Sequence, residues 1–159
     1  MTNDHAHDFD FFFGSWRVHH RQLRRRLADC NERIEFSGTC TAQPTMGGTG
    51  NIDDTVIEKP DGTYRAMTVR AYDATSQSWA IWWIDGRTPH GPVDPPMIGR
   101  FQDGIGTFLA DDTFEGRKIK VRFLWSGITL TACRWEQAFS ADGGATWETN
   151  WEMACTRTA

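Results

Sequence analysis

The sequence KIKVRFLW, Lys118 to Trp125, begins with polar and apolar residues in strict alternation. Successive side chains of a β-strand point to opposite faces, so Lys118, Lys120 and Arg122 share one face. The isoleucine, valine, phenylalanine and tryptophan at the odd-numbered positions share the other face. The pattern predicts a strand whose odd-numbered face is buried and whose even-numbered face meets solvent.

Similar short runs follow one another from Trp16 onward, separated by glycine-containing turns such as Asp103-Gly104 and Glu115-Gly116. This spacing is typical of an all-β sandwich or barrel, and an open sheet of so many strands would leave two bare edges. The connections are short, so we expect one antiparallel up-and-down barrel of about ten strands. The expected strands are Ser15–Leu27, Glu32–Gln43, Asn51–Glu58, Tyr64–Asp73, Ser78–Asp85, Ile98–Gln102, Gly106–Phe114, Lys118–Trp125, Thr129–Ser140 and Thr146–Thr156.

The chain has 159 residues, the usual size of one domain, and we expect a single domain over residues 1–159. Its 8 Trp and 10 Phe can form a wide core. The net charge of -4 argues against a general nucleic-acid binder, and no apolar run is long enough to span a bilayer. Met1–Asp10 lacks the pattern of a secretory signal, so we expect a cytoplasmic protein without nucleic-acid or membrane partners.

Two segments are expected to cover the ends of the barrel. Asp8–Phe13 can form one short helical turn that lays its phenylalanines over one opening. Gly86–Pro96 is the one long irregular stretch and contains four prolines, so it is a candidate lid over a barrel mouth.

The start of the first strand carries a family resemblance. Gly14-Ser15-Trp16 after a short helical turn resembles the lipocalin and calycin signature, in which the Trp closes one barrel end beneath an Arg near the end of the last strand. Arg157 stands where that arginine would be. The run Phe9–His20, together with Arg134-Trp135-Glu136-Gln137, also resembles a family of uncharacterised bacterial lipocalin-like proteins. The resemblance implies a lipocalin-like barrel and brings no assigned reaction.

The barrel interior is the first candidate site. Four tryptophans could form flat walls for a planar or hydrophobic small molecule, with Gln137 and Thr149 as hydrogen-bonding groups and Trp147 as a further wall. The alternative is a barrel filled by these bulky side chains. Arg87, His90 and Arg100 flank the lid and could recognise a carboxylate or phosphate at the mouth. The four wall residues are Trp83, Trp125, Trp135 and Trp151.

A histidine and a carboxylate are candidates for catalysis. His20 shares the inward face of Trp16, and Asp85 shares the parity of Trp83 on a strand that ends at the lid. Such a pair could transfer protons near neutral pH in a cofactor-independent lyase, isomerase or cyclase. The alternative is a histidine satisfied by backbone or water inside the barrel.

The last hairpin offers a rival face. Pairing Phe139 with Trp147 places Trp135 opposite Trp151, and Cys133 opposite Met153, on the inward side. The outward side then carries a cluster of charged and polar groups. These groups could bind or catalyse, form surface ion pairs, or lie in a homodimer interface. They are Arg134, Glu136, Glu148 and Asn150.

The cysteines and the N-terminal histidines do not predict a metal centre. Cys30, Cys40, Cys133 and Cys155 lack metal-ligand spacing, and we expect reduced thiols, no native metal and no cofactor. Three hypotheses follow. The preferred one is binding of a small hydrophobic or aromatic molecule, the second is the proton-transfer enzyme, and the third is an oligomeric interaction module with a filled barrel.

Overall fold

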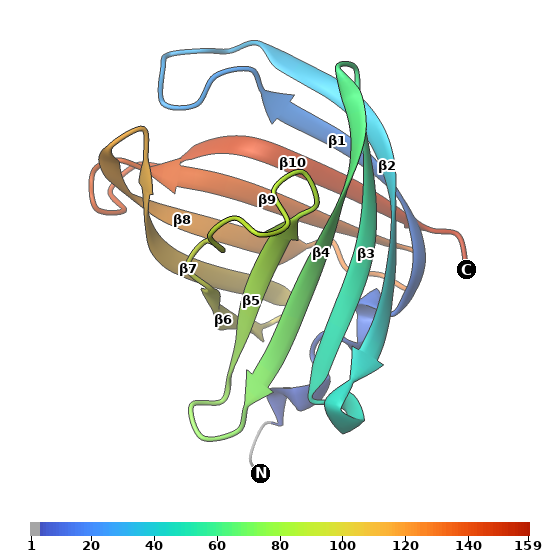
Figure 1. Cartoon of the computed structure of the whole chain (residues 1–159). Helices are drawn as coiled ribbons and strands as arrows, with labels where there is room; N and C mark the ends of the chain where they lie inside the picture. The colour runs from blue at the N-terminus through green and yellow to red at the C-terminus, as the bar shows by residue number, and fades with distance from the viewer. Residues whose placement is uncertain (1–3) are drawn as a thin grey trace.

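The computed structural model describes residues 4–159, which form one closed antiparallel barrel (Figure 1). Each strand pairs with its neighbours in sequence, and β1 closes the sheet by pairing with β10, so the predicted up-and-down barrel is confirmed. The first three residues of Met1–Asp10 lie outside the described residues. The strands are β1 Gly14–Leu23, β2 Arg33–Thr45, β3 Gly50–Lys59, β4 Gly62–Asp73, β5 Ser78–Asp85, β6 Met97–Gln102, β7 Ile105–Phe114, β8 Arg117–Ser126, β9 Ala132–Ser140 and β10 Glu148–Arg157.

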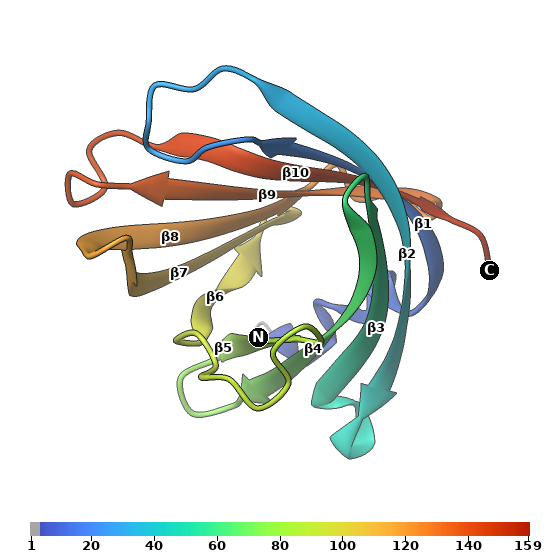
Figure 2. The same cartoon turned by 45° about the horizontal axis from the view of Figure 1, so that its top comes forward.

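The alternating strand directions give the barrel two different ends. The 3-10 turns η1 (His5–His7) and η2 (Asp10–Phe12) lie at the end where β1 begins (Figures 1 and 2). The connections β1–β2, β3–β4, β5–β6, β7–β8 and β9–β10 gather at the opposite end, which we call the mouth. A further 3-10 turn, η3 (Met46–Gly48), joins β2 to β3 at the closed end. No helix within residues 4–159 has the length and apolar character needed to cross a membrane.

The N-terminal turns close one end of the barrel, as the sequence predicts. Phe9 is completely buried, with its ring centroid 5.0 Å from that of Trp79 and 4.9 Å from that of Phe101. The indole N–H of Trp79 donates to the backbone carbonyl of His5 across 2.9 Å, which fixes the first turn to the barrel wall. Aromatic packing therefore fills the closed end.

Trp16 and Arg157 complete this closure. They lie opposite each other on β1 and β10, and the guanidinium carbon of Arg157 is 4.3 Å from the centroid of the Trp16 ring. Arg157 also donates hydrogen bonds to the backbone carbonyls of Phe11, Phe13 and Leu130. One arginine thus ties the N-terminal turns and the β8–β9 loop to the last strand, in the arrangement expected from the signature.

The faces of β8 agree with the alternation of its sequence. Ile119, Val121 and Trp125 are buried, whereas Lys118 is exposed. The pairing of β9 with β10 does not agree with the prediction. Trp135 lies opposite Met153, so its predicted pairing with Trp151 is wrong.

A bulge at Asn150 accounts for part of this difference. Before it, Phe139 faces Glu148 rather than the predicted Trp147, and the register shifts by one further residue beyond it. An extra residue in one strand of an antiparallel pair locally interrupts the alternation of faces. As a consequence, Asn150 is completely buried instead of facing solvent.

The pairing of β5 with β6 is short and leaves a seam at the mouth. Only Trp79, Ala80 and Ile81 of β5 have partners on β6, so the end of β5 extends beyond the sheet contact. The irregular Gly86–Pro96 segment spans this region between the two strands (Figure 2). The segment therefore borders the opening at the seam.

Candidate ligand-binding site

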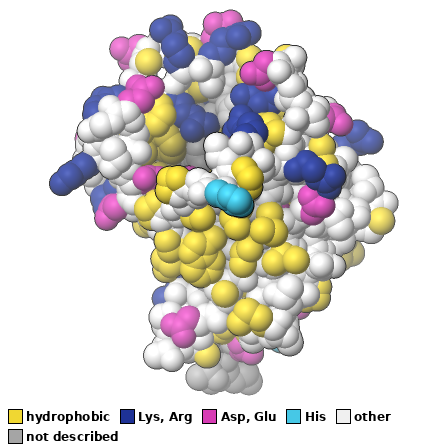
Figure 3. Space-filling model, viewed as in Figure 1, with side chains coloured by type: hydrophobic (Ala, Val, Ile, Leu, Met, Phe, Trp, Pro, Cys, Tyr) yellow, Lys and Arg dark blue, Asp and Glu magenta, His cyan; other side chains and the backbone are white. Residues whose placement is uncertain are grey.

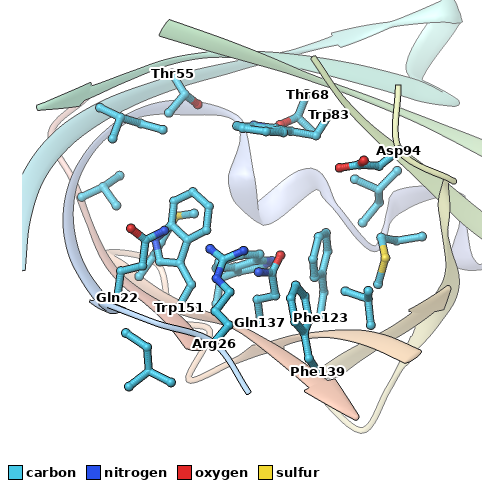
Figure 4. A pocket seen from close by; sticks show the side chains of 18 of the residues that line it. Gln22, Arg26, Thr55, Thr68, Trp83, Asp94, Phe123, Gln137, Phe139 and Trp151 are labelled. Carbon is cyan, nitrogen blue, oxygen red and sulfur yellow. The ribbon is translucent and has the colours of Figure 1, made fainter. Parts of the chain in front are cut away.

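A cavity of about 620 Å³ extends from the mouth to Phe12 of the N-terminal turn. Its entrance is visible as a hollow in the surface (Figure 3), and its lining side chains are drawn in Figure 4. The barrel is therefore not filled throughout: aromatic residues fill the closed end and leave the mouth half open. Several predicted ligand-binding residues border the cavity, although their part in binding stays a prediction. They are Trp83, Arg87, Trp125, Trp135, Gln137 and Trp151.

The aromatic walls are ordered by edge-to-face packing. The ring centroids of Trp135 and Trp151 are 5.5 Å apart with an interplanar angle of 88°, and that of Phe123 is 4.9 Å from Trp135. Such packing holds flat surfaces in fixed orientations. Trp147 was expected to be a further wall, but it does not border the cavity, and the guanidinium of Arg122 lies 4.5 Å from its ring centroid.

Polar groups interrupt the apolar walls at a few points. Gln22, Thr55, Thr68 and Gln137 border the cavity, and the side-chain amide of Gln137 donates to Asn150 across 2.8 Å. Thr149, expected beside Gln137, is not among the lining residues, because the register change carries it away. The result is a mostly apolar chamber with a small set of hydrogen-bonding groups.

A buried ion pair forms the deepest polar feature of the cavity. Arg70 on β4 donates to Asp53 on β3 across 2.8 Å and to Asn51 across 2.9 Å. The guanidinium carbon of Arg70 also lies 5.1 Å and 5.3 Å from the ring centroids of Phe9 and Phe12. Among the described residues, Nε of Arg70 and Nδ2 of Asn51 have no hydrogen-bond partner. We did not predict this pair from the sequence.

His20 lies behind the cavity wall rather than on it. Its side chain is completely buried, and its ring stacks on Phe36 with centroids 4.7 Å apart. The indole N–H of Trp151 donates to Nδ1 of His20 across 3.0 Å. Desolvation by burial, aided by the neighbouring His19, lowers the pKa of His20 to about 4, so the imidazole is neutral at neutral pH.

Asp85 lies at the mouth and is held by Arg87. The carboxylate accepts from the guanidinium of Arg87 across 2.8 Å, and this bond is the largest cause that lowers the pKa of Asp85. Asp85 borders a smaller hollow of about 200 Å³ beneath the Gly86–Pro96 loop. His20 and Asp85 share no contact, so the fold does not assemble the two into one acid–base pair. Their catalytic role stays a prediction.

Of the three residues expected to flank the lid, one borders the cavity and two do not. Arg87 borders the cavity, and the loop adds Asp94 and Pro95 to its rim. His90 is exposed and is not among the lining residues. Arg100 is directed to the carbonyl of Ser76 at the other end of β5, because β6 runs away from the mouth.

The rival face of the last hairpin is only partly assembled. Arg134 and Glu152 form an exterior ion pair of 2.8 Å, and Glu136 lies 3.6 Å from Arg134. Glu148 instead accepts a hydrogen bond from the backbone N–H of Leu27 across 2.8 Å. The expected placement of Asn150 on this face is wrong, because the bulge buries it.

The thiol at the cavity wall is not poised for nucleophilic attack. Burial and the nearby Asp53 raise the pKa of Cys40 to about 12, so the protonated thiol predominates at neutral pH. Cys155, which also borders the cavity, is buried and has a raised pKa through its contact with Cys133 and its burial. All four cysteines are free.

Comparison with known proteins identifies the fold. No protein-family model matches the sequence, and no match is found among curated proteins. The solved structure of an S-type phycobiliprotein lyase from Guillardia theta is similar, with a TM-score of 0.62 and 11% sequence identity. The similarity covers 96% of this chain and 91% of the lyase chain. At this identity the likeness establishes a lipocalin-like barrel and nothing about activity.

Proposed function

We propose that this protein binds a small molecule with a flat, largely apolar body in the mouth half of the barrel. The observation that carries the proposal is the cavity of about 620 Å³, a volume typical of small-molecule sites. Its tryptophan walls supply large apolar surfaces, and Gln22 and Gln137 supply hydrogen bonds that can orient a ligand. We also propose that the protein is a member of the bacterial lipocalin-like family and that it is located in the cytoplasm.

The enzymatic alternative has less support. A similar barrel serves a phycobiliprotein lyase, but at 11% identity this likeness supports the fold alone. His20 has no exposed surface and a pKa near 4, which makes it a weak base at neutral pH. A proton-transfer role for His20 and Asp85, and a homodimer through the outer face, therefore remain predictions.

Binding can be tested with N-phenyl-1-naphthylamine, a neutral aromatic probe that fluoresces when it leaves water. Thr68 is buried on the cavity wall, so Thr68→Phe should occupy part of the cavity and weaken probe binding by about tenfold or more, which corresponds to ~1.4 kcal/mol. Thr107 points outward on β7, and Thr107→Phe is the matched control that should leave binding unchanged. Absence of probe binding to the folded parent protein, or equal binding by both variants, would overturn the proposal.

A further inference from the structure

The rim of the cavity carries an arginine without a carboxylate partner. Arg26 lies in the β1–β2 loop, is half-buried and points into the cavity beside Gln137 and Trp151 (Figure 4). Its guanidinium carbon is 5.3 Å from the ring centroid of Phe139. Within residues 4–159, no carboxylate oxygen lies within 4.0 Å of the Arg26 guanidinium, whereas Arg24 and Arg87 at the mouth each contact a carboxylate.

Two other arginines at the mouth have carboxylate partners, whereas neither Arg26 nor the adjacent Arg25 has one among the described residues. Arg24 is 2.8 Å from Glu32, and Arg87 is 2.8 Å from Asp85. Glu148 is near enough to influence Arg26, but one of its oxygens accepts the backbone N–H of Leu27. The positive charge at the cavity rim is therefore not neutralised by a direct contact.

The loop that carries Arg26 is held on two sides. The backbone N–H of Leu27 donates to Glu148 on β10, and the carbonyl of the same residue accepts from Arg117 on β8 across 3.2 Å. These bonds fix the backbone next to Arg26 before any ligand arrives. A preorganised group loses less conformational entropy on binding, so such anchoring favours recognition.

The surroundings of Arg26 also give the mouth two electrostatic sides. Arg25 and Lys59 line the cavity on the same side as Arg26, and Figure 3 shows Lys and Arg side chains gathered around the hollow. Asp94 and Asp112 line the rim from the β5–β6 loop and β7. Partial burial, Asp112 and Asp85 raise the pKa of Asp94, as expected where negative charges crowd together. An anion at the mouth would be drawn to the first side and repelled from the second.

We propose, on the basis of the proposed function, that the ligand carries an anionic group and that Arg26 binds this group at the mouth. A guanidinium presents a planar fork of N–H donors that matches a carboxylate, sulfonate or phosphate. The apolar part of the ligand then lies deeper, between Trp83 and Trp151. Bound in this way, the ligand supplies the counter-charge that the chain does not place beside Arg26.

Two probes with the same aromatic skeleton separate the anionic group from the apolar body. 8-Anilinonaphthalene-1-sulfonate carries a sulfonate, whereas N-phenyl-1-naphthylamine does not. Arg26→Gln removes the charge-assisted hydrogen bonds to the sulfonate, so it should weaken binding of the sulfonate probe by about tenfold or more. The affinity for the neutral probe should be nearly unaffected. Arg26→Lys keeps the positive charge without the planar fork of donors, so its affinity for the sulfonate probe should lie between those of the parent and Arg26→Gln. Arg100 lies away from the cavity, so the control Arg100→Gln, which also removes one positive charge, should change the affinity for neither probe.

The outcomes distinguish this inference from the proposed function. If the parent binds neither probe, the proposed binding function fails. If the neutral probe binds but sulfonate affinity is the same in the parent and Arg26→Gln, only the role of Arg26 is wrong. Equal weakening of both probes by Arg26→Gln, with an unchanged melting temperature, would assign Arg26 to the shape of the loop and would also overturn the inference.

Discussion

Trp151 donates its indole N–H to Nδ1 of His20, so a cavity wall is fixed by a histidine that does not itself border the cavity. An Nδ1 that accepts requires the neutral tautomer with its proton on Nε2. Among the described residues Nε2 has no partner, and a Cβ at Gly38 would lie 3.1 Å from it. The glycine opposite Val18 on β2 thus leaves room for the imidazole.

Neutral His20 should make stability depend on pH. The unfolded chain takes up a proton at His20 near pH 6.5, whereas the folded chain does so only near pH 4. The stabilising contribution is therefore complete above pH 6.5 and is lost progressively as the pH falls to about 4, by about 3 kcal/mol. Urea unfolding between pH 7.5 and 4 should show a loss in the parent that is larger by this amount than the loss in His20→Asn.

The adjacent exposed histidine provides the control for this measurement. His19 bonds to Glu35 on the outside of the barrel, and His19→Asn should keep most of the pH dependence of the parent. A His20→Asn variant whose unfolding free energy falls with pH as steeply as that of the parent would show that His20 is not the group responsible.

The closure by Trp16 and Arg157 should be a main source of stability. Trp16 is almost completely buried, and truncation of a buried Trp typically costs about 3 to 5 kcal/mol. Trp16→Ala should therefore lower the unfolding free energy by that amount. Arg157→Lys should also destabilise, since an ammonium cannot reproduce donation to three carbonyls. Thermal and urea unfolding measure these effects, with Leu130→Ala as an exposed control. If Trp16→Ala and Arg157→Lys were as stable as the parent, the proposed closure would be wrong.

The sequence predicts the architecture because its strands are short and its turns carry clear signals. The Trp16 signature and the alternation in Lys118–Trp125 each placed side chains on the correct face. The bulge at Asn150 had no such signal, because one extra residue changes the register without changing the local composition. The bulge changes the cross-strand partners of the residues that follow it and buries Asn150, which was predicted to lie on the outer face.

The buried ion pair was missed for a different reason. On β4 the apolar Met67 and Val69 face outward, while Thr68 and Arg70 face inward, so hydrophobic alternation indicates the wrong face. A charged residue in a strand is ordinarily assigned to solvent. Only the structure places Asp53 next to Arg70 and reveals that the inner face of this wall is polar.

The exterior charges of the last hairpin should contribute little. Arg134 is half exposed and contacts Glu152 and Glu136, and exposed ion pairs are typically worth ~0 to 1 kcal/mol. Arg134→Ala should therefore change the unfolding free energy by no more than about 1 kcal/mol and leave the binding of both naphthalene probes unchanged. A large loss of probe binding in this variant would direct attention back to the outer face as the site.

The pair of Arg70 and Asp53 should behave as a coupled unit. Both side chains are almost completely buried, and removing one partner of such a pair leaves an uncompensated charge that typically costs about 3 to 5 kcal/mol. Asp53→Leu and Arg70→Met should each destabilise by this amount. The double variant should be more stable than either single variant, because it removes both buried charges together. Urea unfolding of the four proteins measures the coupling.

An exposed pair on the same two strands is the matched control for this cycle. Arg65 on β4 contacts Asp54 on β3 across 2.7 Å, and both side chains are largely exposed. Asp54→Leu and Arg65→Met should be nearly additive, with a coupling energy below about 1 kcal/mol, because water screens the interaction. Similar coupling in the two cycles would mean that burial does not govern the strength of the interior pair. A strong coupling energy for Arg70 and Asp53, with a weak one for Arg65 and Asp54, would establish that burial makes the two interior residues depend on each other for stability.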